Sequence, residues 1–123
     1  MQTAGTKVIG VWDDHDYGIN DGSKDFSKKH VTREIFLDFI EEPAKSPRRL
    51  HKDSAIHQDY IINGENGFKT HIILLDNRFD FDKNSADRLG DEQWKWLDES
   101  IKTHYDADAT LIVAGVQIIR DNS

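Results

Sequence analysis

The chain has 123 residues with 16 basic and 23 acidic side chains, which gives a formal net charge of −7. A chain of this length is expected to form one domain with a sizeable core, and its acidity argues against a general binder of nucleic acids or anionic membranes. It has no cysteine, which excludes disulfides, thiolate zinc sites and cysteine nucleophiles. No apolar run approaches the roughly 20 residues that a membrane helix needs, so no membrane segment is expected.

The N-terminal third is predicted to contain a strand, a loop and a helix. Residues 7–12 are rich in β-branched side chains, as is typical of a short buried strand. Residues 17–23 contain two glycines and indicate a loop. Residues 25–41 carry apolar side chains at four- and five-residue steps, which predicts a helix that ends before Pro43. The side chains expected on the buried face of this helix are Val31, Ile35, Phe36, Phe39 and Ile40.

A β-hairpin is predicted in the middle of the chain. Residues 44–54 are basic and polar and indicate a surface loop. Residues 56–62 and 68–75 resemble strands on either side of a strong turn signal at 63–67. The unbroken run Ile72-Ile-Leu-Leu75 favours an interior strand that is buried on both faces.

The C-terminal third is predicted to add a helix and a last strand. Gly90-Asp91 opens a helix that runs to about His104, with Trp94, Leu97 and Ile101 on its apolar stripe and Trp94 in the core. Residues 109–115 predict another buried strand. Strands that alternate with helices favour an α/β layered fold, with a partly parallel sheet covered by helices.

An acidic cluster after the first predicted strand is the main candidate for chemistry. Asp13, Asp14, His15 and Asp16 are consecutive, and Asn20-Asp21 follow closely. Neighbouring carboxylates repel one another, so a folded chain tolerates such a cluster where a cation neutralises it or water solvates it. A metal-assisted hydrolase needs oxygen ligands for the metal and a protonatable group near the leaving oxygen. The other interpretation is a solvated acidic turn with an exposed histidine.

A second candidate lies at the end of the predicted interior strand, where Asp76 and Arg78 follow one another closely. Ligands bind at the carboxyl ends of strands in α/β sheets, and an arginine can clamp phosphate oxygens with two hydrogen bonds. A purely structural role in the turn is equally compatible with the sequence. Arg48-Arg49 could attract an anionic substrate, but a solvated loop is the simpler interpretation. The remaining histidines singled out, which show no metal-ligand spacing, are His51, His57 and His71.

Several blocks of the chain closely resemble those of the PhoD-like alkaline phosphatases and phosphodiesterases, of the calcineurin-like metallophosphatase superfamily. They occur in the order found in that family and span nearly the whole chain. The blocks are Trp12-Asp-Asp-His-Asp-Tyr-Gly-Ile-Asn-Asp-Gly22, Phe36-Leu-Asp-Phe39 with Glu42-Pro43, Ser46-Pro-Arg-Arg49, Ile73-Leu-Leu-Asp-Asn-Arg78, Leu89-Gly-Asp-Glu-Gln-Trp-Lys-Trp-Leu97 and Ala114-Gly-Val-Gln117. Two departures are mild: Gly22-Ser23 replaces a Gly-Gly pair, and Ala114-Gly-Val-Gln117 replaces Ser-Gly-Ile-Gln.

The resemblance implies a metal-dependent phosphoric ester hydrolase, whose substrates are phosphate esters. It implies that Asp14 is a metal ligand and that His15 contacts the phosphate or assists the leaving group. Asn20 is implied, more weakly, as a second metal ligand, and Arg78 as a substrate-binding residue. The implied cofactors are a dinuclear metal pair, iron with calcium or another divalent pair. The implied fold is part of a metallophosphatase-type α-β-β-α layered sandwich with a mixed sheet.

The resemblance also implies that residues 1–123 are the central portion of a single PhoD-like domain. Family members carry a bridging aspartate upstream and further ligands downstream, and a dinuclear site with ions about 3.5–4 Å apart needs them. One alternative is therefore a catalytically inactive truncated paralogue that acts as a scaffold or binds a cation weakly. Another is an acidic calcium-binding module, although the run 14–25 lacks the register and final glutamate of an EF-hand. The sequence leaves the substrate, the compartment and the oligomeric state open.

Overall fold

A three-stranded mixed sheet forms the centre of the molecule. The computed structural model describes residues 5–118, and in this range the strands are β1 (Gln58–Asn63), β2 (Lys69–Leu75) and β3 (Ala109–Ala114). β2 is central, antiparallel to β1 and parallel to β3. The predicted mixed α/β fold with a partly parallel sheet is therefore confirmed.

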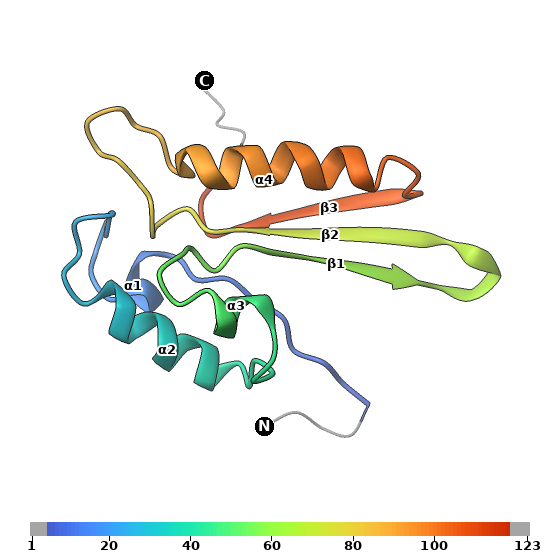
Figure 1. Cartoon of the computed structure of the whole chain (residues 1–123), viewed down its shortest axis with the longest axis horizontal. Helices are drawn as coiled ribbons and strands as arrows, with labels where there is room; N and C mark the ends of the chain where they lie inside the picture. The colour runs from blue at the N-terminus through green and yellow to red at the C-terminus, as the bar shows by residue number, and fades with distance from the viewer. Residues whose placement is uncertain (1–4, 119–123) are drawn as a thin grey trace.

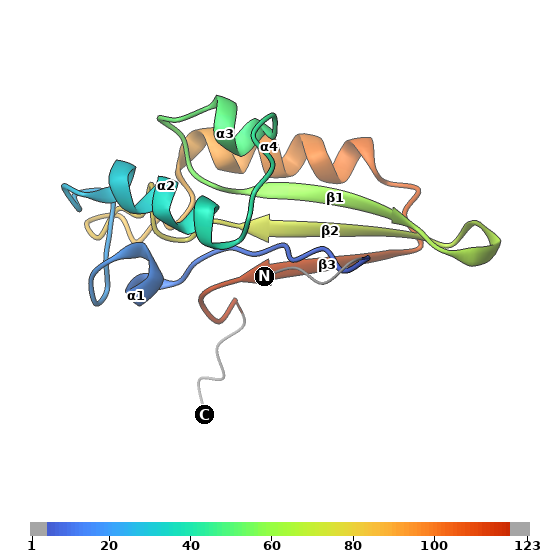
Figure 2. The same ribbon diagram turned by 90° about the horizontal axis from the view of Figure 1, so that it is seen from below.

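Four α-helices surround this sheet in the described part of the chain. α4 runs along the strands above the sheet in the view of Figure 1, whereas α1, α2 and α3 lie below the strands in that view, with α1 and α2 towards the carboxyl ends of β2 and β3. The view from below shows the segment before α1 passing along the sheet towards that same end (Figure 2). The helices are α1 (Asp14–Tyr17), α2 (Lys29–Phe39), α3 (Pro47–Leu50) and α4 (Gly90–Thr103).

The predicted hairpin is confirmed, and its turn contains the short 3₁₀ helix η1 (Glu65–Gly67). Asn66 adopts φ 60° and Gly67 φ 77°, a left-handed conformation that asparagine and glycine tolerate best. The turn fixes the register, because Asn63 pairs with Lys69 and every earlier pair follows from it.

The segment 7–12 is not a strand, contrary to the sequence prediction. At Gly10 the backbone carbonyl accepts a 2.7 Å hydrogen bond from Arg48 Nη1. A side chain therefore takes the place that a neighbouring strand would have. Arg48 also donates to the Tyr60 hydroxyl, so α3 fastens this segment to the sheet. The predicted solvated basic loop is thus wrong at Arg48, which is buried and structural.

The predicted buried face of α2 is only partly correct. Ile40 is buried and Phe36 packs against the core cluster that contains Trp12. Val31, Ile35 and Phe39 are exposed, with Phe39 at 84% of its accessible surface, and the helix also buries Arg33 and Leu37. Burial of Arg33 is possible because its guanidinium donates to three backbone carbonyls, those of Arg48, His51 and Ser54.

The α4 helix has the predicted bounds to within one residue, but its buried side differs from the apolar stripe. Trp94 is 52% exposed, whereas Gln93 and Ser100 are buried. Trp96 and Leu97 pack against the cluster that contains Ile73. A helical apolar pattern alone therefore misplaced the contact face by about one residue.

The last strand β3 has the predicted position but not the predicted burial. It lies at an edge of the described sheet, and Leu111, Ile112 and Val113 are exposed there. Within residues 5–118, no helix combines the length and apolar character that crossing a membrane requires.

Candidate functional site

Asp76 anchors the candidate site, because it joins residues 13–21, which we call the acidic loop, to the end of β2. Its Oδ1 accepts hydrogen bonds from the Trp12 indole at 2.8 Å and from the backbone amides of Arg78 and Phe79. Its Oδ2 accepts one from the Ile56 amide at 2.9 Å. The carboxylate is fully buried, and four donors of this kind compensate the loss of water. Asp76 is thereby committed to structure.

Arg78 closes the acidic loop from the other side. Its Nε and Nη2 both contact Asp13 Oδ1, at 3.0 and 2.7 Å, and its Nη1 lies 3.3 Å from Asp21 Oδ1. Nη1 also donates to the carbonyl of Gly22 at 3.4 Å. The guanidinium is almost completely buried. Because it contacts both Asp13 and Asp21, it supplies much of the positive charge that neutralises the clustered carboxylates. A substrate phosphate would have to displace Asp13 or Asp21 to reach it.

Gly115 allows the end of β3 to approach the same loop. A Cβ atom at this position would lie 2.6 Å from the Trp12 carbonyl oxygen and 3.0 Å from Asp13 Cα. Both neighbours are backbone atoms, so any side chain here would push the two segments apart. The ends of β2 and β3 and the start of α1 thus meet at one edge of the sheet.

Asp14 is held in one orientation at the start of α1. Its Oδ2 accepts a hydrogen bond from the Asp21 amide at 2.8 Å, and its Oδ1 accepts one from the His15 amide at 2.9 Å. The Asp21 hydrogen bond lowers the pKa of Asp14 most, and the contacts with His15 lower it further despite a smaller opposing effect of desolvation. Asp14 is therefore an ionised, oriented carboxylate.

His15 and Asn20 lie next to this carboxylate. His15 Nδ1 is 3.0 Å from Asp14 Oδ1, and the imidazole is 77% exposed. The loop that contains Asn20 returns to Asp14, because the neighbouring Asp21 donates its amide to that residue. The structure thus brings Asp14, His15 and the loop of Asn20 together, with Arg78 behind them.

The residues of this loop only partly fit the metal pair that the resemblance implies. Asp14 Oδ2 keeps one lone pair after accepting from Asp21, and Asn20 can add one amide oxygen. Asp13 and Asp76 are engaged with Arg78 and with buried donors. A two-metal site needs a bridging carboxylate and several further ligands. The described residues of the loop do not provide that set.

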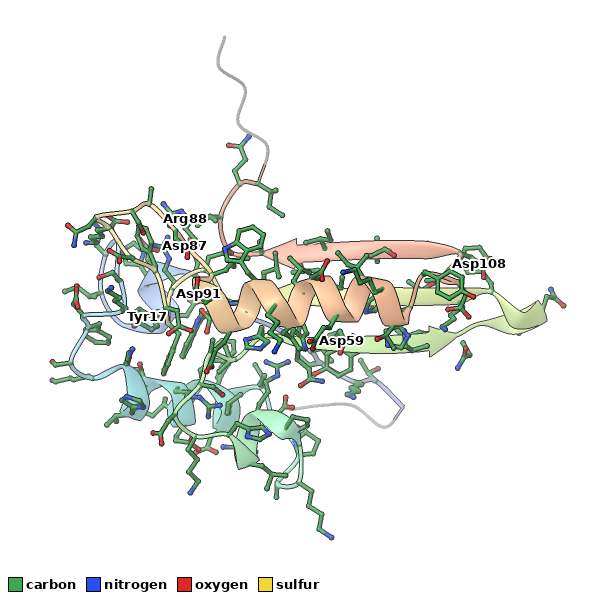
Figure 3. All side chains as sticks on the ribbon, turned by 45° about the horizontal axis from the view of Figure 1, so that its top comes forward. Tyr17, Asp59, Asp87, Arg88, Asp91 and Asp108 are labelled. Atoms are coloured by element: carbon green, nitrogen blue, oxygen red, sulfur yellow. The ribbon has the colours of Figure 1, made fainter. Side chains whose placement is uncertain are left out.

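A second acidic region surrounds the start of α4. Asp87 and Asp91 lie there with Arg88, at the same end of the molecule as Tyr17 (Figure 3). A surface pocket in this region has a volume of about 430 Å³. Its lining residues are Lys24, Asp80, Asp82, Ser85, Asp87, Gly90, Asp91 and Glu92. Burial raises the pKa of Asp80, and the nearby negative charge of Asp76 adds to the effect. This excess of carboxylates disfavours a bare anionic ligand.

A different group of side chains, away from the acidic loop, has the geometry to hold a metal ion. Asp59 on β1, His71 on β2 and His104 after α4 each offer one ligand atom, and these atoms lie within 4.8 Å of one another. His71 Nε2 is 2.8 Å from Asp59 Oδ2, and His104 Nε2 is 3.9 Å from the same oxygen. Among residues 5–118, the acidic loop forms no such group of three His, Asp or Glu side chains.

The charge state of Asp59 suits this group. Burial raises its pKa, but hydrogen bonds from Ser100 and His71 together outweigh that effect, so the pKa is lowered. Ser100 Oγ donates to Asp59 Oδ2 at 2.5 Å. Asp59 is thus a carboxylate at neutral pH.

The sequence does not predict this group, because its members are far apart in the chain. His71 shows no metal-ligand spacing along the sequence, and the structure buries its side chain against Asp59. The hairpin register contains the missing signal. Pairing Asn63 with Lys69 places Asp59 opposite Ile73, two positions from His71 on the same face of β2. Ser100 and His104 are then one helical turn apart above that face.

Comparison with protein-family models, curated proteins and solved structures gives no significant match to this chain. The family resemblance consequently rests on the sequence blocks alone.

Proposed function

We propose that this chain is part of a metal-dependent phosphoric ester hydrolase of the PhoD-like type. The observation that carries the proposal is the meeting of an oriented, ionised Asp14 and an exposed His15 at the carboxyl ends of β2 and β3. Ligand sites of α/β folds form at that edge of the sheet. The blocks of sequence that resemble the family include Trp12, Asp76 and Gly115, which position the loop.

Each proposed role belongs to a side chain at this edge. Asp14 and Asn20 would be metal ligands, since carboxylate and amide oxygens suit hard cations. His15 would hydrogen-bond a phosphoryl oxygen or protonate the leaving oxygen, because its exposed imidazole can reach a substrate. Arg78 would bind substrate only if the phosphate replaced one of its carboxylate partners, so its first role is to hold the loop.

The proposed cofactors are iron with calcium, or another divalent pair. The proposed setting is an α-β-β-α layered sandwich of which residues 1–123 form the central portion. Both parts of the proposal require ligands and a second layer from residues beyond those described, because the acidic loop holds too few ligands for two ions.

The alternative is an inactive scaffold or weak cation binder, and one observation favours it. Arg78 already pairs with Asp13 and Asp21, and Lys83 lies 3.7 Å from Asp21. The protein's own cations therefore neutralise much of the acidic cluster, which lessens its need for a metal.

Hydrolysis of p-nitrophenyl phosphate and of its diester separates the two functions. The polypeptide that contains this stretch in its natural context is loaded with iron and calcium, zinc or manganese and assayed at neutral and alkaline pH. The proposal predicts metal-dependent turnover that is abolished in Asp14→Ala, and about 10²–10⁴-fold slower in His15→Ala because proton transfer by a positioned side chain contributes about that factor. The 123-residue chain alone is expected to show little activity.

Two exposed residues provide matched controls. Asp53→Ala and His51→Ala remove an exposed acid and an exposed imidazole outside the loop and should leave turnover unchanged. Metal binding without turnover would support the inactive scaffold. Turnover that is indifferent to Asp14 and His15 would refute the proposed roles.

A further inference from the structure

We propose that Asp59, His71 and His104 form a binding site for a divalent transition-metal cation, with Zn²⁺ as the representative ion. The site would connect the end of α4 to the β1–β2 hairpin. It is distinct from the acidic loop and does not depend on the proposed hydrolase activity. Figure 3 shows Asp59 beneath α4, away from Asp87 and Asp91 near the start of that helix.

The spacing of the ligand atoms suits a tetrahedral ion. Zn–N and Zn–O bonds of about 2.0–2.1 Å place neighbouring ligand atoms roughly 3.3 Å apart. Two of the separations, 2.8 Å from His71 Nε2 and 3.9 Å from His104 Nε2 to Asp59 Oδ2, lie on either side of that value. The ligand atoms of the two histidines lie within 4.8 Å of each other, so a rotation of the His104 side chain towards both partners would complete the three-ligand arrangement.

The ligand types select the class of cation. Two imidazoles and one carboxylate are typical of zinc and other first-row transition metals, whereas calcium and magnesium prefer oxygen ligands. Three protein ligands leave a fourth position for water. The ring centroids of His71 and His104 lie 4.6 Å apart, so the two imidazoles are direct neighbours.

The surroundings also favour a cation at this point. His104 follows the last turn of the 14-residue helix α4, where the negative end of the helix dipole lies. Asp59 and His104 keep about a quarter of their side-chain surface exposed, 21% and 26%, so an ion can enter from solvent. His71 is buried and already contacts Asp59, which preorganises one side of the site.

The same residues do not form a nucleophilic triad. Asp59 Oδ2 and Ser100 Oγ both contact the same ring nitrogen, His71 Nε2, at 2.8 and 3.1 Å. A serine–histidine–aspartate relay needs the acid and the serine on opposite nitrogens of the imidazole. Ser100 instead donates to Asp59, which is the role of an outer residue that orients a ligating carboxylate.

Calorimetric titration of the 123-residue chain with Zn²⁺ tests the site, with Ca²⁺ as the comparison ion. We expect one-to-one binding of Zn²⁺, no comparable binding of Ca²⁺, and a thermal midpoint that rises with zinc concentration. Zinc should shift the ring-nitrogen NMR signals of His71 and His104. These signals locate the ion without any substitution.

Matched variants complete the test. His104→Asn should weaken zinc binding at least ten-fold, since even indirect partners of a metal ligand are typically worth about 10–100-fold. His51→Asn removes an exposed imidazole elsewhere, and Asp14→Asn removes the proposed ligand of the acidic loop; both should bind zinc as the parent chain does. The proposal is overturned if zinc does not bind, if binding is unchanged in His104→Asn, or if only Asp14→Asn abolishes it. Loss in Asp14→Asn alone would place the ion in the loop of the proposed hydrolase.

Discussion

Asp76 holds more of the candidate site in place than any side chain of the acidic loop. Its carboxylate receives four hydrogen bonds, from the Trp12 indole and the amides of Ile56, Arg78 and Phe79. Asp76→Asn would place an amide NH₂ where one oxygen now accepts, leaving buried donors facing a donor. We expect a loss of about 3 kcal/mol in the free energy of unfolding, measured by chemical denaturation.

A matched change at the surface separates this effect from the general loss of a negative charge. Asp53 has a side chain that is 98% exposed, so Asp53→Asn should alter the free energy of unfolding by less than about 0.5 kcal/mol. Equal losses in both variants would show that the buried hydrogen bonds of Asp76 are not the source of its effect.

Replacing Asp80 by asparagine should stabilise the fold, whereas the same replacement of Asp76 should destabilise it. Burial raises its pKa above the ordinary value of 3.8, and Asp76 raises it further. The folded state then binds a proton more readily than the unfolded state, so stability falls as pH rises from about 3.8 through the folded-state pKa. Asp80→Asn should therefore be more stable than the parent at pH 7, and the difference should vanish below pH 3.8. Urea denaturation at both pH values measures it, and a gain that persists in acid would contradict the stated cause.

The packing of α2 can be tested through one buried and one exposed residue. Arg33→Met keeps the length of the side chain but leaves the carbonyls of Arg48 and Ser54 without the arginine donor, while that of His51 still accepts from Ser54. The change should cost about 3 kcal/mol or more. Phe39→Ser removes an exposed aromatic ring and should change stability by less than about 0.5 kcal/mol. Thermal or urea unfolding of both variants checks this order. The reverse order would restore the apolar face predicted from the sequence.

At the level of elements, local signals in the sequence were sufficient and long-range contacts were not. The hairpin and α4 were predicted closely, because a turn signal and a helical opening are read from neighbouring residues. Part of the buried face of α2 was missed because one of its two fully buried side chains is Arg33, whose partners come from residues 48–54. The segment 7–12 was misassigned because its carbonyl at Gly10 is satisfied by an arginine side chain.

The candidate site divides in the same way. The position of Arg78 at the edge of the sheet could be inferred from the end of β2. Asp14 and His15 reach that edge although the segment before them is not a strand, and the pairing of Arg78 with Asp13 could not be inferred. The group around Asp59 depends on the register of the hairpin and on which side of α4 packs over the sheet, and spacing along the sequence gives neither.

On the scale of the whole molecule, two hydrophobic clusters are connected through the end of β2. One contains Trp12, Leu37 and Phe79, and the other contains Ile73 and Leu89. Asp76 contacts both clusters. Its carboxylate accepts a hydrogen bond from Trp12 of the first cluster, and its backbone amide and carbonyl are both hydrogen-bonded to a side chain of α4.

That side chain is Gln93, and its removal should uncouple the two clusters. Gln93 Oε1 accepts from the Asp76 amide and its Nε2 donates to the Asp76 carbonyl, both at 2.9 Å. Gln93→Ala leaves both buried backbone groups without a partner, which should cost about 2 kcal/mol or more. The hydrogen bonds of Gln93 join α4 to Asp76, whose carboxylate binds Trp12 in the other cluster. Without them, the two clusters should unfold separately and not in a single transition.

Two probes of unfolding can detect this change. In a background that carries both Trp94→Phe and Trp96→Phe, fluorescence reports the buried Trp12 as the one remaining tryptophan, whereas far-ultraviolet circular dichroism reports the helices and strands together. The two denaturation curves should coincide with Gln93 present and separate in Gln93→Ala. Lys95→Ala, an exposed change on the same helix, should leave them coincident. Coincident curves in Gln93→Ala would mean that packing alone, without the Gln93–Asp76 hydrogen bonds, joins the two halves of the core.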